Sequence, residues 1–144
     1  MTVIRHVCGV ILYNTNGEVL LQQRDDKPDL RYAGCWTFFG GAVEDGEHHA
    51  AAILRELEEE LELTDVQPRL WYEYECPDRT IAGQVTTYNH MYMAALTVPL
   101  ESLTLHEGQA MRFFTRADAL ALDLAFMQTP VLQRYYQMLE EQGV

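Results

Sequence analysis

Apolar residues, many of them β-branched, run almost without interruption over residues 3–13. Such a run predicts a strand that is buried on both faces. Residues 14–17, Asn-Thr-Asn-Gly, have the composition of a turn, and residues 18–24 return with strand character. The chain is therefore expected to begin with a β-hairpin.

Residues 40–63 start with two glycines and continue with helical periodicity. Glu56, Glu59 and Glu60 stand at positions i, i+3 and i+4, so they are expected to project from a single face of the helix. The apolar residues gather on another arc of the helical wheel, which is the expected core side: Ala50, Ile53, Leu54, Leu57 and Leu61. The acidic face is thus predicted to be a separate surface.

Two strands are expected after this helix. Apolar and polar positions alternate over residues 70–76, which indicates a strand with two different faces. This strand is expected to pair antiparallel with residues 85–97. The turn between the two strands is predicted from its breaker residues, which are Pro77, Asp78, Arg79 and Gly83.

The last third of the chain predicts a short strand over residues 111–114 and two further helices. Thr115 can cap the first helix, with Asp118 three residues further on. The second is expected to open at Thr129-Pro130, because proline is favoured in the first turn of a helix. The order of these elements predicts one mixed α/β domain over residues 1–144.

The like charges on the acidic helix face repel one another, and a bound cation would relieve this repulsion. Like charges at helical neighbour spacing destabilise a helix by ~0.2–0.5 kcal/mol per pair. Mg²⁺ prefers oxygen ligands and keeps waters that substrate phosphates can displace. A solvated acidic face is the alternative and is the commoner outcome for glutamate-rich helices. Gly40 and Gly41 favour a ligand site, because a glycine backbone can bend sharply and expose a carbonyl or an amide.

The spacing of these residues resembles the Nudix box, Gly-x5-Glu-x7-Arg-Glu-(aliphatic)-x-Glu-Glu-x-Gly-(aliphatic). The matching positions are Gly41, Glu47, Arg55, Glu56, Leu57, Glu59, Glu60 and Leu63. Glu62 stands where the motif has glycine, near the helix C-terminus, where a left-handed residue is common. This departure is expected to cost on the order of 1 kcal/mol in stability. Phe39 stands where many relatives carry proline, which alters the loop that faces the substrate.

The resemblance implies the Nudix fold, an α/β/α sandwich with a mixed sheet, and hydrolysis of a nucleoside diphosphate linked to a further group X. It also implies Mg²⁺, with Mn²⁺ as the alternative, to neutralise the phosphates and to provide a deprotonated water. The metal ligands implied by the matching positions are Glu56, Glu59, Glu60 and the Gly40 carbonyl. Glu107 looks like an additional metal-binding glutamate of MutT-type members, and Glu101 is a weaker rival for that role.

Other motif positions are expected to support these ligands. Arg55 and Glu47 would pair with each other or with Glu60 and so aim the carboxylates, next to Gly41. The general base differs among members of the family. Glu59 or Glu56 is expected to fill this role here, with Glu107 as a third candidate.

Candidates for substrate binding lie outside the motif. Arg24 is expected to contact a phosphate or to form a surface salt bridge, and Trp36 and Phe38, like Tyr32, to stack on a base or to pack in the core. The Gln128 amide could read a base, or its segment could simply lead into a helix. A nucleoside triphosphate, ordinary or oxidised, is the expected substrate and would give the monophosphate and pyrophosphate.

Three alternatives to hydrolysis of a nucleoside triphosphate are compatible with parts of the sequence. A nucleotide sugar or ADP-ribose is the alternative substrate. A Nudix-fold module that binds a nucleotide without cleaving it usually lacks glutamates of the motif, and all of them are present here. A plain α/β interaction protein would leave the glycine loop and the fixed spacing unexplained.

The composition limits the kinds of partner that the protein is expected to bind. The net charge of −12 argues against long nucleic acids, which need a basic surface. A small phosphorylated nucleotide remains compatible, since a metal ion neutralises both partners locally. No run approaches the ~20 apolar residues of a membrane span, and no secretory signal opens the chain, so a cytoplasmic monomer or homodimer is expected. The histidines were expected to form no ligand group: His6, His48, His49, His90 and His106.

Overall fold

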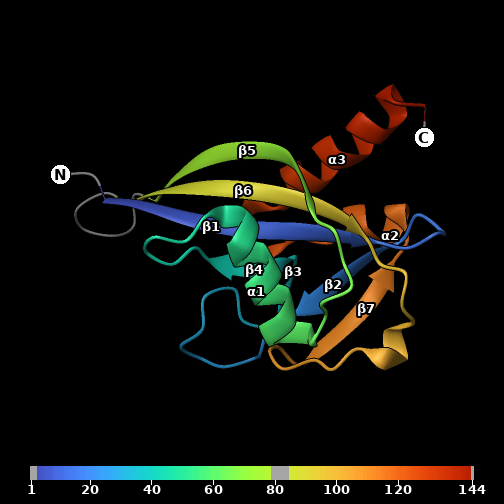
Figure 1. The fold of residues 1–144 in the computed structure, drawn as a ribbon, viewed down its shortest axis with the longest axis horizontal. Coiled ribbons are helices and arrows are strands. Elements are labelled where there is room, and N and C mark those ends of the chain that lie inside the picture. Colours follow the sequence, from blue (N-terminus) through green and yellow to red (C-terminus); the bar gives the residue numbers. More distant parts are fainter. Residues whose placement is uncertain (1–2, 79–84, 144) are drawn as a thin grey trace.

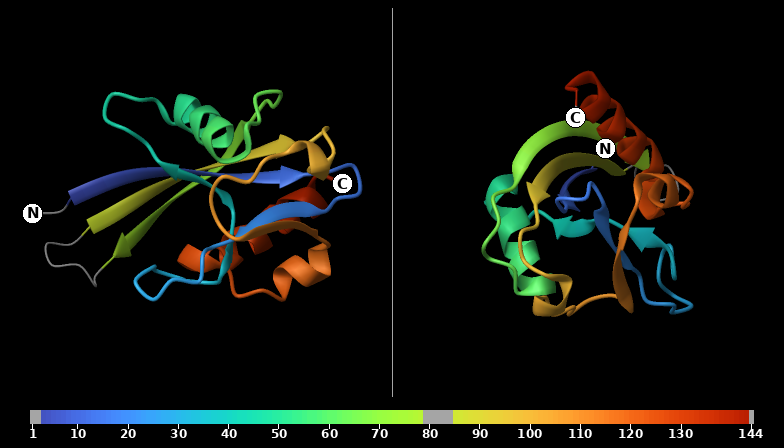
Figure 2. Two further views of the ribbon diagram at one scale, coloured as in Figure 1. Left: turned by 90° about the horizontal axis from the view of Figure 1, so that it is seen from below. Right: turned by 90° about the vertical axis from the view of Figure 1, so that its right-hand side faces the viewer.

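The structure is a computed structural model that describes residues 3–78 and 85–143. A mixed β-sheet lies between two layers of helices (Figure 1). Helix α1 (His49–Leu61) covers one side, and helices α2 (Arg116–Leu120) and α3 (Thr129–Glu141) cover the other, as the two views of Figure 2 show. The expected mixed-sheet α/β/α sandwich is confirmed.

The sheet has seven strands, and its long central pair comes from distant parts of the chain. Five strands form its main path, in the order β3 (Trp36–Thr37), β2 (Val19–Gln23), β1 (Val3–Tyr13), β6 (Val85–Ala95) and β5 (Arg69–Asp78). Off this path, β4 (Phe39–Ala42) pairs with β1, and β7 (Ala110–Phe114) pairs with β2. Strand β1 runs parallel to β6 along its whole length. Two 3-10 turns complete the fold, η1 (Leu100–Ser102) and η2 (Ala125–Met127).

The local pairings follow the expected strand order. Strands β1 and β2 form the predicted antiparallel hairpin, with Leu12 opposite Leu20. Strands β5 and β6 also pair antiparallel as expected. Pro77 and Asp78, however, belong to β5 and not to the turn after it, because β5 stays paired with β6 up to Asp78. Arg79 and Gly83 lie outside the described residues.

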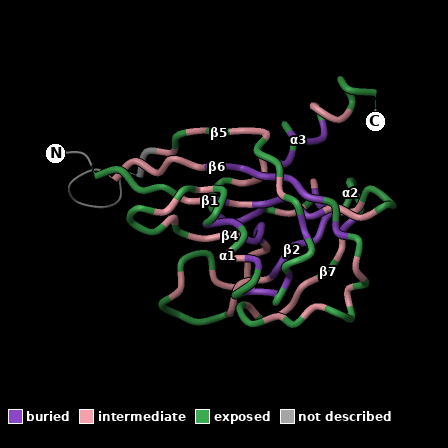
Figure 3. Tube along the Cα trace, in the orientation of Figure 1, coloured by how far each residue is buried: buried purple, intermediate pink, exposed green. Residues whose placement is uncertain are grey.

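The core has one half on each face of the sheet. Val10 and Leu12 of β1 pack under α1, whereas Ile11 between them packs with residues of α3. The prediction that this strand is buried on both faces therefore holds for its second half only. Val3 and Ile4 are 51% and 55% exposed, because the N-terminal end of β1 extends beyond the helices that cover the sheet (Figure 3).

Helix α1 is turned further than the helical wheel predicted. Ala50 and Leu54 are exposed, so their assignment to the core side is wrong. The buried side chains are instead Ala52, Ile53, Leu57, Glu60 and Leu61. The buried arc therefore includes a glutamate, and burial of a carboxylate needs an explanation from its surroundings.

The end of α1 agrees with the sequence analysis of Glu62. Its backbone is left-handed, with φ 54° and ψ 33°, and its N–H bonds to the Glu58 carbonyl. The N–H of Leu63 bonds back to the Leu57 carbonyl at 3.3 Å, which completes a Schellman-type end. The Glu62 side chain contacts His106 Nε2 at 2.6 Å on the surface.

Replacing Glu62 with glycine is expected to stabilise the protein by about 0.5–1 kcal/mol. The gain from an unstrained backbone exceeds the loss of an exposed pair with His106. Urea unfolding of Glu62→Gly and wild type measures the difference. Glu62→Ala is the matched control, because it removes the pair and keeps the strained backbone. Equal stability of the two variants would contradict the explanation.

Candidate active site

A cavity of about 800 Å³ collects most of the residues that the sequence singled out. Strand β4 and helix α1 form one part of its wall, with Gly40, Gly41, Glu56 and Glu60. The segment before β7 contributes Glu107. Residues more than 60 positions apart in the chain therefore line the same cavity.

The two glycines lie in strand β4 and do not form the sharp bend that was expected. They pair with β1, with Gly40 opposite Gly9 and Gly41 opposite Cys8. A Cβ atom on Gly41 would lie 2.5 Å from Glu56 Oε1, and one on Gly40 would lie 2.1 Å from the Cys8 carbonyl oxygen. Gly40 also has φ 148°, which favours glycine. Glycine is needed because the helix carboxylates and β1 lie directly against this backbone.

Arg55 links the acidic residues around the cavity. Its guanidinium donates two hydrogen bonds to Glu47, at 2.9 and 3.0 Å. It also donates to Glu56 at 3.1 Å and to Glu59 at 3.2 Å. A further bond to the Ala42 carbonyl, at 3.0 Å, ties the helix to the end of β4. The side-chain bonds from Arg55 lower the pKa of Glu47 to about 2.

Glu60 lies deepest, with only 3% of its surface exposed. Its Oε2 accepts a hydrogen bond from the Gly40 N–H at 3.3 Å. Burial raises the pKa of Glu60 to about 9, and a hydrogen bond with Glu107 and the nearby charge of Glu56 act in the same direction. Burial also raises the pKa of Glu56. These carboxylates would be stabilised as anions by a cation placed between them.

The arrangement fits a hard divalent cation. Glu56, Glu60 and Glu107 offer carboxylate oxygens from two separate segments, and Gly40 lines the same cavity. Oxygen donors of this kind suit Mg²⁺ or Mn²⁺. Glu59 lies further out, because its side chain is 59% exposed and turns to Arg55. Glu101 lies in η1, away from the residues that line the cavity.

The candidates for substrate binding divide into two groups. Arg24, Phe38 and Gln128 line the cavity, together with Tyr32. Trp36 does not line it, because its ring packs edge-on against Phe114 at 4.8 Å between ring centres. Trp36 is partly buried and packs against the core cluster that contains Phe114, which is the packing alternative.

The Gln128 amide has a defined orientation. Its Oε1 accepts hydrogen bonds from the Phe38 N–H at 3.0 Å and from the Thr37 hydroxyl at 2.9 Å. A backbone N–H can only donate, so the oxygen and nitrogen of this amide are distinguished. The amide nitrogen is then the part of Gln128 that remains for a ligand.

The sequence analysis did not predict two features of the cavity wall, which are the left-handed backbone of turn η2 and the aromatic contacts of Phe126. Phe126 and Met127 have positive φ angles of 55° and 57°, a conformation that non-glycine residues seldom adopt. The Phe126 ring lies 4.7 Å from that of Tyr32 and 4.8 Å from the Arg24 guanidinium. Turn η2 thus presents an aromatic face to the cavity, and neither periodicity nor turn composition signals this.

Comparison with known proteins agrees with this fold. The family model of the NUDIX domain matches residues 4–135. A CTP pyrophosphohydrolase of Escherichia coli (strain K12) is 31% identical over 137 residues, which cover 94% of this chain and 93% of that protein. An 8-oxo-dGTP diphosphatase of the same organism is 38% identical over 73 residues, which cover 49% of this chain and 55% of that protein.

A solved structure shows the same fold. The MutT protein of Methanosarcina mazei Go1 has a TM-score of 0.78 at 18% identity, covering 95% of this chain and 96% of that one. The chain belongs to the Nudix hydrolase family. Members of the family act on small nucleotide substrates. In the described part of the chain, no helix has the length and apolar character needed to cross a bilayer.

The raised pKa of Glu60 predicts a pH dependence of stability in metal-free protein. The folded state favours the neutral carboxyl, so its contribution is complete below the ordinary pKa of 4.5 and is lost as pH rises toward about 9. Glu60→Gln cannot ionise and keeps a similar shape. The melting temperature of wild type is therefore expected to fall relative to Glu60→Gln between pH 6 and 9, as measured by calorimetry in chelator.

Comparison of the two proteins at each pH removes the contribution of other titrating groups. Adding Mg²⁺ at pH 8 should raise the melting temperature of wild type more than that of the variant. If the melting temperatures of both proteins changed in parallel across this pH range, the raised pKa of Glu60 would be contradicted.

Proposed function

We propose that the protein is an Mg²⁺-dependent pyrophosphohydrolase that cleaves a nucleoside triphosphate into the monophosphate and pyrophosphate. The observation that carries this proposal is that three carboxylates, of which Glu60 is buried, line the same cavity as the Phe126 ring and the Gln128 amide. Glu56, Glu60 and Glu107 would hold the metal beside the phosphates. Phe126 and Gln128 would hold the base at the other end.

Several residues of the chain would prepare the reaction. Mg²⁺ or Mn²⁺, once bound, would supply charge neutralisation for the phosphates and a more acidic water. Arg55 fixes Glu56 and Glu59 in place through its hydrogen bonds, with Glu47 as its anchor. Glu56 is the favoured general base because its carboxylate lines the cavity, whereas Glu59 would have to turn inward from the surface.

Arg24 is suited to positioning the substrate. Its Nε donates to the Arg31 carbonyl at 2.9 Å, and its guanidinium stacks over Phe126. These contacts hold a positive charge at the cavity wall, where it could bind a phosphate oxygen. The proposed role of Phe38 is packing beneath the base, since its side chain is buried but lines the cavity.

The amide of Gln128 supports recognition of a base by hydrogen bonding. With its oxygen held by Phe38 and Thr37, its nitrogen would donate to a ring nitrogen or carbonyl of the base. A relative that covers 94% of this chain is named a CTP pyrophosphohydrolase. CTP is therefore the first substrate to test, followed by oxidised guanine nucleotides, nucleotide sugars and ADP-ribose.

Pyrophosphate release from this panel, with Mg²⁺ and then with chelator, tests the activity. Glu56→Gln is expected to lower kcat by about 10²–10⁴-fold, as for loss of a general base. Glu59→Gln should lower it less, because the Glu59 side chain lies at the rim. Glu58→Gln is the matched control, since Glu58 is an exposed glutamate on the same helix. Its activity should equal that of wild type.

The outcomes separate the proposals. A larger loss in Glu59→Gln than in Glu56→Gln would assign the role of the general base to Glu59. Products other than monophosphate and pyrophosphate, identified by mass, would replace the triphosphate with another substrate class. A folded protein that cleaves nothing in the panel would refute the proposed reaction.

Selectivity for the base is expected to depend on Gln128. Gln128→Leu keeps the volume of the side chain and removes its hydrogen bonds, so kcat/KM for the preferred nucleotide should fall about tenfold or more. Discrimination between CTP and the other triphosphates should shrink with it. Gln133→Leu, at an exposed site on α3, is the control. Unchanged discrimination in Gln128→Leu would remove this residue from base recognition.

A further inference from the structure

Four of the five histidines gather at one place, which corrects the expectation that they form no ligand group. His6 lies on β1, His90 on β6, and His48 and His49 at the start of α1. All four line a second cavity, of about 450 Å³. A cluster drawn from three distant segments is not visible in the sequence.

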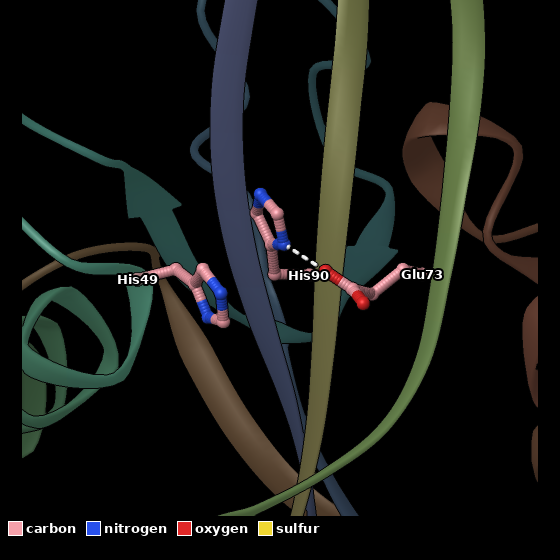
Figure 4. A group of neighbouring side chains, drawn as sticks. All are labelled: His49, Glu73 and His90. Atoms are coloured by element: carbon pink, nitrogen blue, oxygen red, sulfur yellow. Dashed lines mark hydrogen bonds and ion pairs between the residues drawn. The ribbon is translucent and has the colours of Figure 1, made fainter.

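The centre of this cluster is His90, which is buried to 7% exposure. Its Nδ1 lies 2.6 Å from Glu73 Oε2 on β5, and its Nε2 lies 2.9 Å from His6 Nδ1. The His49 ring stacks on the His90 ring, with 4.0 Å between centres and 3° between planes. Figure 4 shows His49, His90 and Glu73 converging from α1, β6 and β5. Their ligand atoms lie within 4.8 Å of one another.

We propose that His49, His90 and Glu73 form a second metal site, which takes a first-row transition metal such as Zn²⁺. Two imidazoles and one carboxylate are a common ligand set for Zn²⁺ and leave a fourth position for water or another ligand. Mg²⁺ prefers oxygen donors and would not compete well for two ring nitrogens.

Neighbouring residues hold the second nitrogen of each imidazole, as in known metal sites. His6 contacts His90 Nε2, so Nδ1 of His90 is the nitrogen that faces Glu73. Tyr92, a buried residue, hydrogen-bonds His49 Nδ1 and leaves Nε2 of that ring for a metal. His48 accepts a hydrogen bond from the Ala50 N–H at 3.0 Å and caps the helix, so it is not assigned as a ligand.

The charge state and mobility of these groups suit a metal. Burial and the nearby rings of His90 and His48 lower the pKa of His49, which keeps its ring neutral and able to bind at neutral pH. Bonds of about 2.0–2.1 Å from zinc to nitrogen require the two stacked rings to tilt toward a common point. Glu73 can follow, because its side chain is 52% exposed.

This site is distinct from the active-site cavity. Successive residues of a strand point to opposite faces of the sheet. Tyr74 and Asn89 line the active-site cavity, whereas their neighbours Glu73 and His90 point to the other face and meet each other there. The two cavities adjoin at β1 and β4, because Arg5 and Ala42 line both of them.

Zn²⁺ binding to the whole protein, measured by calorimetry in excess Mg²⁺, tests the site. Wild type is expected to bind one Zn²⁺ per chain. His49→Ala and Glu73→Gln should each weaken binding at least tenfold, as expected for loss of a ligand. Both side chains are partly or largely exposed, so these variants should fold. His106→Ala is the control, because His106 lies elsewhere on the surface, beside Glu62.

A second variant separates this site from the carboxylates of the active site. Glu56→Gln should bind Zn²⁺ as wild type does in the same buffer. Binding that disappears in Glu56→Gln and survives in His49→Ala would place the ion at the active site and overturn the proposal. Failure of wild type to bind Zn²⁺ would overturn it as well. Neither result depends on whether the protein hydrolyses a nucleotide.

Discussion

Glu56 and Glu60 lie directly against the backbone of β4, and the site depends on this contact. The contact is possible because Gly41 has no side chain, so the Glu56 carboxylate can lie against the strand, while the lack of a side chain on Gly40 lets β1 come close. The strand in turn stays in the sheet through its pairing with β1. Any Cβ at Gly41 would displace the Glu56 carboxylate, so the helix, the strand and the cavity constrain one another.

The acidic residues of the site fall into an outer and an inner group. Arg55 donates hydrogen bonds to the outer group, Glu47 and Glu59, and also to Glu56. Glu60, in the inner group, is hydrogen-bonded by the Gly40 N–H and by Glu107, neither of which carries positive charge. Burial raises the pKa of Glu60, and the hydrogen bond with Glu107 adds to this effect, whereas the hydrogen bonds from Arg55 lower the pKa of Glu47. A protein cation contacts one part of the cluster, and the proposed metal ion would neutralise the rest.

Sequence reasoning succeeded where information is local. The hairpin, the β5–β6 pair, the left-handed backbone at Glu62 and the Nudix motif all depend on residues close together in the chain, whereas strands β3 and β4 were not predicted. The predictions from sequence were wrong where tertiary contacts determine how a segment is oriented. The rotation of α1, which exposes Leu54 and buries Glu60, depends on how the helix meets β4. The histidine cluster depends on the register of β1, β5 and β6, which no local pattern specifies.

The parallel pairing of β1 with β6 has a consequence for synthesis of the chain. Val3 lies opposite Val85 and Tyr13 opposite Ala95, so each pair is separated by more than 80 residues. A ribosome will therefore have made the whole glutamate-rich helix well before the strand that completes the central sheet, and Glu107 emerges later still. During that interval the nascent chain carries the complete motif but no enclosed cavity. Its first half is thus exposed to chaperones and proteases before the cavity is complete.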